Sequence, residues 1–207
     1  PMKIKPKQHE PWEDKIEIHP WKKFHSKKNT CAKLIIGSFP PNRFTTHCER
    51  KTNCDMDFFY GSKDNGFWEL FCETFGLNYA IPDDLELIKQ WLIFNKWGLT
   101  DIVSSCKRKL DTAYDTDLIS IEWNKNGVSE ILDKNEINTI YFTSVWVRDK
   151  FEKHINSSKN IKSYVLPSPS RNGLRSIKRA TYLDLKFKEN ESSTDFRKRC
   201  YIDILRG

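Results

Sequence analysis

The chain has 207 residues and a mass of 24.5 kDa, with 38% hydrophobic, 13% aromatic and 30% charged residues and a formal net charge of +7. This composition is typical of a soluble globular protein, and the absence of roughly eighteen consecutive apolar residues excludes a membrane-embedded one. The basic N-terminus lacks the apolar core of a secretory signal, so we expect a cytoplasmic protein.

Four short apolar runs, each bounded by turn residues, predict β-strands at 33–37, around 98–103, at 139–144 and at 164–166. Helical spacing of apolar residues predicts helices between and after the strands. They lie at 67–75 with Asp64 as N-cap, from 82 to 93, at 128–132 and 145–154, and in two pieces after residue 171, one opened by a capping box of Ser192 and Asp195.

Strands that are almost entirely apolar and alternate with helices favour a parallel sheet covered on both faces, an α/β fold. We expect one domain over residues 31–207, with an N-terminal arm over 1–30 that packs Trp21 and Phe24 against the sheet edge. In such sheets ligands bind beyond the carboxyl ends of the strands. Those ends are polar or proline-rich turns at 37–40, 100–101, 143–144 and 167–170.

The basic residues gather at the two ends of the chain. Residues 1–30 carry eight Lys/Arg against four Asp/Glu, residues 171–207 carry ten against five, and the middle carries seventeen against nineteen. This asymmetry is compatible with a polyanionic partner that meets a basic rim, and equally with basic termini that only keep the protein soluble.

The six cysteines form no CxxC pair, which favours reduced thiols over a disulfide framework. His47, Cys48 and Cys54 could surround a metal ion on one loop, but their spacing matches no common zinc pattern. We predict neither a metal nor another cofactor.

Four motifs in order, GSFPP (37–41), FYGSKDNGFW (59–68), GLTDIVSSCKR (98–108) and LPSPSRNG (166–173), resemble those of the uracil-DNA glycosylase superfamily. The likeness is closest to its mismatch-specific and hypoxanthine branches. It implies a three-layer α/β/α sandwich with a short, mainly parallel central sheet. It also implies a monomeric, cofactor-free enzyme that flips a deaminated base, uracil or hypoxanthine, out of DNA and hydrolyses its glycosidic bond.

Hydrolysis of that bond requires a water held against the sugar and stabilisation of the departing base. The resemblance places Asn65 as the residue that positions water and Tyr60 as the ring that stacks the base. Phe39 occupies the position where the best-known members of the superfamily carry Asp or Asn. Ser38 is a second catalytic candidate, and Phe59 and Phe39 are further base-binding candidates. A purely structural interpretation makes Asp64 an N-cap and Asn65 an ordinary first-turn residue.

Polar residues at two other strand ends, Thr100, Asp101 and Ser144, are candidate readers of the base edge, although turn formation alone also explains them. The resemblance assigns DNA opening to the 168–172 loop. The predicted DNA-binding residues are Ser168, Ser170, Arg171, Asn172, Arg175, Lys178 and Arg179.

Two alternative functions remain open from the sequence. One is a non-catalytic nucleic-acid-binding protein of the same fold. It is favoured by Phe39 and by Arg171, which stands where members of the superfamily commonly carry a bulky apolar or a small residue. The other is an α/β enzyme that hydrolyses a free nucleoside, for which the basic ends would be incidental.

Overall fold

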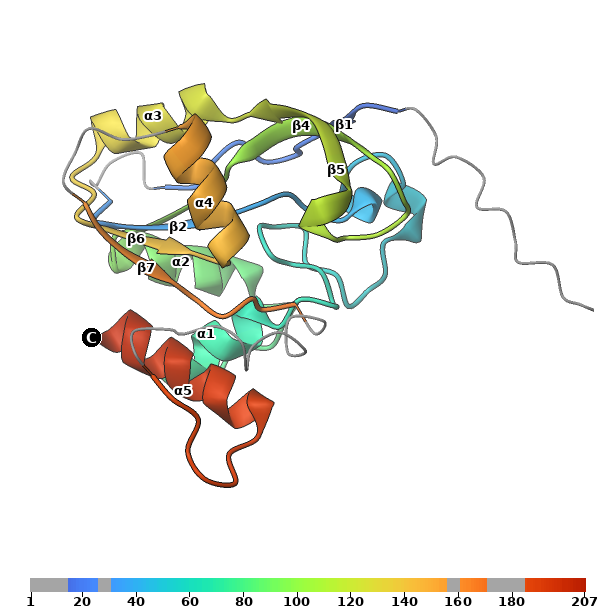
Figure 1. The fold of residues 1–207 in the computed structure, drawn as a ribbon. Helices are drawn as coiled ribbons and strands as arrows, with labels where there is room; N and C mark the ends of the chain where they lie inside the picture. Colours follow the sequence, from blue (N-terminus) through green and yellow to red (C-terminus); the bar gives the residue numbers. More distant parts are fainter. Residues whose placement is uncertain (1–14, 26–30, 156–160, 171–184) are drawn as a thin grey trace, which may run out of the picture.

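The centre of the protein is a sheet of four parallel strands in the order β3-β2-β6-β7 (Figure 1). The structure is a computed structural model that describes residues 15–25, 31–155, 161–170 and 185–207. The strands are β2 (Lys33–Gly37), β3 (Trp97–Asp101), β6 (Thr139–Phe142) and β7 (Lys162–Val165). All four lie where the apolar runs predicted strands.

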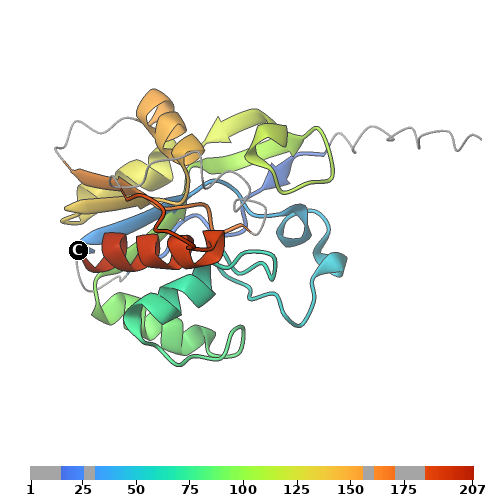
Figure 2. The ribbon, with the colours of Figure 1, turned by 60° about the horizontal axis from the view of Figure 1, so that its bottom comes forward.

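Helices cover both faces of this sheet, so the predicted three-layer α/β/α sandwich is confirmed. Figure 1 shows α3 (Lys125–Lys134) and α4 (Val145–His154) on one face, and α1 (Phe67–Phe75), α2 (Leu85–Phe94) and α5 (Ser193–Arg206) on the other. In Figure 2, α5 lies alongside α1, which is the contact that completes the second layer.

The strand β2 shows why both faces are apolar. Leu34 and Ile36 belong to the core cluster under α3 and α4, whereas Ile35 belongs to the cluster under α1, α2 and α5. All three side chains are fully buried. Because successive side chains of a strand point to opposite faces, a central strand with helices on each side must be apolar at every position.

A second, three-stranded antiparallel sheet in the order β1-β4-β5 was not predicted. It comprises β1 (Glu17–Ile18), β4 (Val103–Arg108) and β5 (Leu118–Trp123). Its strands mix polar, charged and apolar residues, and two register shifts interrupt the β4–β5 pairing. The single strand predicted around 98–103 is therefore the end of β3 followed, after Ile102, by the start of β4.

The helix ends agree with the sequence pattern at α5 and differ at α1. The backbone N–H of Asp195 donates to the Ser192 hydroxyl at 3.1 Å, as the capping box predicts. At α1 the N-cap is Gly66 and not Asp64, because Asp64 is engaged in an ion pair with Arg43. The other helical piece predicted after residue 171 lies outside the described residues. No helix within the described parts of the chain is long and apolar enough to cross a membrane.

Candidate functional site

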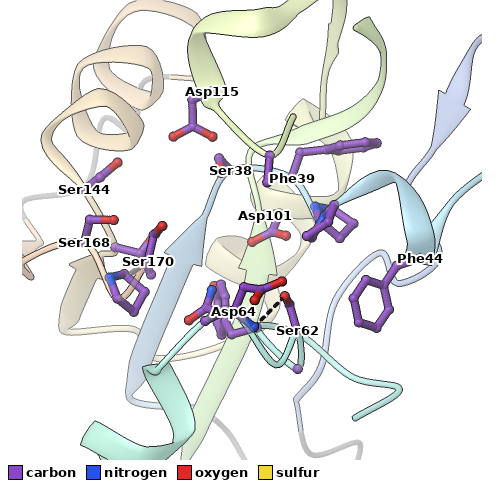
Figure 3. A pocket seen from close by; sticks show the side chains of 18 of the residues that line it. Ser38, Phe39, Phe44, Ser62, Asp64, Asp101, Asp115, Ser144, Ser168 and Ser170 are labelled. Atoms are coloured by element: carbon purple, nitrogen blue, oxygen red, sulfur yellow. Dashed lines mark hydrogen bonds between the residues drawn. The ribbon is translucent and has the colours of Figure 1, made fainter. Parts of the chain in front are cut away.

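A cavity of about 420 Å³ opens where the central strands end. It collects side chains from the ends of β2, β3 and β6, from the loops that follow β7 and precede α1, and from the β4–β5 connection. In Figure 3, Asp101 lies near the centre of these side chains. The lining residues used below are Trp21, Ser38, Phe39, Arg43, Tyr60, Ser62, Asp64, Asn65, Asp101, Asp115, Ser144, Ser168 and Ser170.

Tyr60 reaches the cavity through a left-handed backbone conformation, with φ of 57°. Its hydroxyl donates to the carbonyl oxygen of Thr100 at 3.2 Å. Burial, and then the charge of Asp101, raise the pKa of Tyr60 well above its ordinary value. The phenol is therefore neutral at physiological pH, and the side chain offers one wall of the cavity as an uncharged aromatic surface.

Gly37 allows Tyr60 and Asp101 to come this close to the end of β2. A Cβ atom at position 37 would lie 2.4 Å from Asp101 Oδ1 and 2.5 Å from Tyr60 Cε1. No side chain fits there, so the glycine of the first motif is required by the close approach of these two groups.

Asn65 joins the loop before α1 to the loop after β7. Its side-chain carbonyl oxygen accepts a hydrogen bond from the backbone N–H of Phe67 at 2.9 Å, and residues 65 and 170 form an isolated antiparallel bridge. The adjacent N–H of Gly66 donates to the carbonyl of Pro169 at 3.0 Å. Two motifs separated by a hundred residues of sequence thus share one edge of the cavity.

Helix α5 holds the loop after β7 against this edge. The buried guanidinium of Arg197 donates through Nη1 to the carbonyl oxygens of Ser168, Pro169 and Ser170 at 3.3, 3.4 and 3.1 Å. One turn further along the helix, the Tyr201 hydroxyl donates to the carbonyl of Pro167 at 3.2 Å. These bonds fix the loop backbone, which leaves the side chains of Ser168 and Ser170 directed at the cavity (Figure 3).

A third part of the wall is a network of paired charges around Arg43. Its guanidinium contacts Asp55 at 2.9 Å, Asp64 at 3.0 Å and the Ser62 hydroxyl at 2.6 Å. Burial raises the pKa of Asp55, but hydrogen bonds from Arg43 and from the backbone N–H groups of Lys63 and Thr52 outweigh burial and lower it to about 2. This network holds the long loop between η2 (Cys48–Arg50) and α1 in place.

Two further carboxylates line the cavity, and their hydrogen-bond partners among the described residues are not Arg or Lys side chains. Asp101, at the end of β3, is 4% exposed, and its Oδ2 hydrogen-bonds to His19 Nε2 at 2.7 Å. Asp115, in the 3-10 turn η3 (Asp115–Asp117), hydrogen-bonds to Ser38. Burial, opposed by the Ser38 hydrogen bond and supported by the charge of Asp101, raises the pKa of Asp115 to about 6.

Comparison with solved structures identifies a protein of the same architecture. It is a proposed uracil DNA glycosylase from Methanosarcina acetivorans, determined by NMR, with a TM-score of 0.54 and 18% sequence identity over 92% of this chain and 99% of that chain. The chain has a uracil-DNA-glycosylase-like fold. No family model and no curated protein matches the sequence.

Most of the predicted site residues line the cavity at the strand ends of this uracil-DNA-glycosylase-like fold. They are Ser38, Phe39, Tyr60, Asn65, Asp101, Ser144, Ser168 and Ser170. Ser144 also caps α4, since its hydroxyl accepts the N–H of Val147 at 3.2 Å. The predicted DNA-binding residues Arg171, Asn172, Arg175, Lys178 and Arg179 lie outside the described residues.

Phe59 and Thr100 do not line the cavity, contrary to their prediction as base-binding residues. Phe59 is 1% exposed and packs in the aromatic core, where its carbonyl accepts from Trp68 Nε1 at 2.8 Å. Thr100 is fully buried, and its hydroxyl donates to the carbonyl of Lys22 at 3.0 Å. Phe59 therefore serves core packing behind the lining residue Trp21, and Thr100 serves to hold the N-terminal segment on β3.

Sequence reasoning missed five residues that build the site in this uracil-DNA-glycosylase-like fold: His19, Trp21, Arg43, Asp115 and Arg197. The segment around His19 was predicted to pack on the sheet edge without a chemical role. Asp115 lies between β4 and β5, and the sequence analysis did not predict that hairpin. The loop with His47, Cys48 and Cys54 holds no group of three metal-ligating side chains, and none occurs elsewhere among the described residues.

Proposed function

We propose that this protein is a DNA glycosylase that hydrolyses the bond between deoxyribose and a deaminated base, uracil or hypoxanthine, flipped out of DNA. The observation that carries the proposal is the single cavity of about 420 Å³ shared by Tyr60, Asn65 and the loop that ends at Ser170. Its volume suits one nucleotide, and it offers an aromatic face, an amide and hydroxyl groups at once.

The fold supports the same proposal independently of the motifs. The similar solved structure is described as a proposed uracil DNA glycosylase, and it aligns over nearly the full length of both chains. Fold alone does not determine activity. The argument therefore depends on the side chains in the cavity.

The geometry around Asn65 sharpens the role assigned to it. Its carbonyl oxygen already accepts the N–H of Phe67, which fixes the orientation of the amide, and one lone pair of that oxygen remains for a water. The same side chain lies at the N-terminus of α1, where backbone N–H groups favour the negative charge that develops on the departing base. Tyr60 supplies the neutral surface on which that base stacks.

The test is a single-turnover excision panel on duplex and single-stranded oligonucleotides that contain uracil, hypoxanthine or only normal bases, followed by alkaline cleavage of abasic sites. We expect the wild type to excise at least one deaminated base. Asn65→Ala should slow excision by about a hundredfold to a thousandfold, the usual effect of losing a positioned polar group in an active site. Asn65→Asp keeps the acceptor for the Phe67 N–H and separates loss of the cap from loss of the amide.

The matched control is Asn53→Ala, which removes an exposed amide that does not line the cavity and should excise at the wild-type rate. Undiminished excision by Asn65→Ala would reject the water-positioning role. Duplex binding without excision of any base would identify the non-catalytic alternative. Hydrolysis of free nucleosides, together with weak and salt-independent DNA binding, would identify the nucleoside hydrolase.

A further inference from the structure

The N-terminal segment delivers a buried histidine to the end of β3. His19 Nε2 lies 2.7 Å from Asp101 Oδ2, and the two side chains are 4% and 6% exposed. The backbone N–H of His19 donates to the carbonyl of Ser104 at 2.9 Å, which ties this segment to β4. The imidazole also contacts the rings of Trp21 and Phe39 edge-on, so it has little freedom to rotate.

The hydrogen bonds determine which ring nitrogen of His19 carries the proton. The backbone N–H of Trp21 points at Nδ1 over 3.0 Å, so Nδ1 must present its lone pair. A neutral imidazole then carries its proton on Nε2 and donates it to the carboxylate of Asp101. His19 therefore holds one oxygen of Asp101 in a fixed direction without adding a positive charge.

The other carboxylate oxygen, Oδ1, is buried and has no hydrogen-bond partner among the described residues. The Tyr60 hydroxyl is a neighbouring donor whose pKa Asp101 helps to raise, but its single proton goes to the carbonyl of Thr100 at 3.2 Å. A buried carboxylate oxygen left unpaired costs free energy, and such groups call for a functional explanation. Asp101 lines the cavity, so the charge of its carboxylate acts on whatever occupies the cavity, although Oδ1 itself is closed off from solvent.

We propose that Asp101 is the carboxylate that stabilises positive charge on the deoxyribose ring during base excision, and that His19 is the residue that positions it. This inference rests on the proposed glycosylase function. When the glycosidic bond breaks, its electron pair leaves with the base and the sugar becomes cationic. A water oxygen then bonds to the sugar carbon, and the proton that the water loses balances the proton that the base gains. Asp101 acts by charge and takes no net proton.

Two other acidic side chains line the cavity, and each is less suited to this role. Asp64 has a side chain 63% exposed and paired with Arg43, so its charge is screened by water and already neutralised. Asp115 has intermediate solvent exposure, hydrogen-bonds to Ser38 and feels the charge of Arg108. Of the three carboxylates, only Asp101 combines near-complete burial, a fixed orientation and a free oxygen.

The first experiment measures affinity rather than rate. Duplexes carrying a cationic pyrrolidine abasic analogue or a neutral tetrahydrofuran analogue are bound to the wild type, to Asp101→Asn and to the exposed control Asp83→Asn. We expect the wild type and the control to prefer the cationic analogue by about tenfold or more, and Asp101→Asn to lose that preference. Asparagine has the same shape, so the loss would report the charge.

The second experiment separates the hydrogen bond of His19 from the packing of its ring. His19→Gln retains an N–H that reaches Asp101 but loses the ring, whereas His19→Phe retains a ring against Trp21 and Phe39 but has no donor. We expect His19→Gln to keep more of both the analogue preference and the excision kcat than His19→Phe, with similar KM values. The reverse order would mean that His19 serves only packing.

The outcomes distinguish this inference from the proposed function. A wild type without preference for the cationic analogue overturns the role of Asp101, whatever the excision panel shows. A clear preference that disappears in Asp101→Asn, combined with no excision of any base, overturns the proposed enzyme function and leaves the charged site standing. Melting curves for every variant verify that each one is folded under the assay conditions.

Discussion

Two carboxylates, one behind the cavity wall and one in it, have opposite surroundings. Asp55 does not line the cavity but lies behind Arg43, which does, and it is surrounded by donors: Arg43 at 2.9 Å and the backbone N–H groups of Thr52 and Lys63 each at 2.9 Å. At the strand ends, Asp101 has one uncharged donor and a free oxygen. The first arrangement stabilises a loop, and the second leaves charge available to a ligand.

The difference shows that one carboxylate stabilises the loop, whereas the other is placed to act on a ligand. A fully hydrogen-bonded, ion-paired carboxylate lowers the free energy of the folded state but has no lone pair left for a substrate. An under-satisfied carboxylate raises the free energy of the folded state, and its charge can act on a ligand in the cavity. The variants below test this distinction.

The largest effect is expected from Gly37→Ala at the strand-end wall. The new methyl group would lie 2.4 Å from Asp101 Oδ1 and 2.5 Å from Tyr60 Cε1, so both groups must move. We expect a loss of about 3 kcal/mol in the free energy of unfolding, typical of overpacking, and excision reduced to background. Urea denaturation and the single-turnover assay measure the two losses.

Gly66→Ala is the matched control for this variant, because a methyl group at position 66 would meet its nearest neighbour, the Pro169 carbonyl oxygen, at 3.5 Å. That is ordinary van der Waals contact, so stability should change by less than about 0.5 kcal/mol. If both alanine variants behaved alike, close packing of Gly37 against the two site residues would not be the reason for a glycine there.

Asp55→Asn and Asp101→Asn should change stability in different directions. Asp55→Asn weakens the ion pair with Arg43 and should cost about 2 kcal/mol. Asp101→Asn removes a buried, half-paired charge and should leave the free energy of unfolding unchanged or raise it by up to about 1 kcal/mol. Chemical denaturation at pH 7 compares the two variants with the wild type.

The pH dependence provides a control on the Asp55 result. The pKa of Asp55 falls from 3.8 to about 2 in the folded protein, so its contribution is present above pH 4 and disappears as the pH falls toward 2. The stability gap between wild type and Asp55→Asn should therefore close over that interval. A gap that persisted at pH 2 would attribute the loss to shape and not to charge.

The central sheet could be predicted from the sequence because its strands are buried on both faces. A run such as 33–37, apolar at nearly every position, has few alternatives to a covered strand. The β1-β4-β5 sheet could not be predicted, because Glu17 and Arg108 in it look like surface charges. They are in fact a buried ion pair at 2.8 Å, with both side chains 1% exposed.

The site residues that lie close together in the sequence, within one motif, could be predicted. Those that only the folded chain brings together could not. Asn65 and Tyr60 come from one local segment, so a single motif indicated both. Phe59 and Tyr60 were both base-binding candidates, and only Tyr60 lines the cavity, which it reaches through its left-handed backbone conformation. His19 lies 82 residues from Asp101, and no local pattern marks such a pair.

The smallest effect concerns Asp115, which lies between the two extremes because it hydrogen-bonds to Ser38 and feels the charge of Arg108, yet its pKa is still raised. Its pKa rises from 3.8 to about 6 in the folded protein, so the folded state binds more protons than the unfolded state between these values. Stability should therefore fall as the pH rises from about 4 to 6.

The variant Asp115→Asn cannot ionise and should not show this loss of stability. Since Asp115 is partly exposed, we expect a gain on the order of 1 kcal/mol above pH 6, or about 3 °C in Tm, and no gain near pH 4. Thermal melts across this range, with Asp83→Asn as the exposed control, measure the gain. An equal gain in stability at pH 4 and pH 7 would show that ionisation of Asp115 does not destabilise the folded protein.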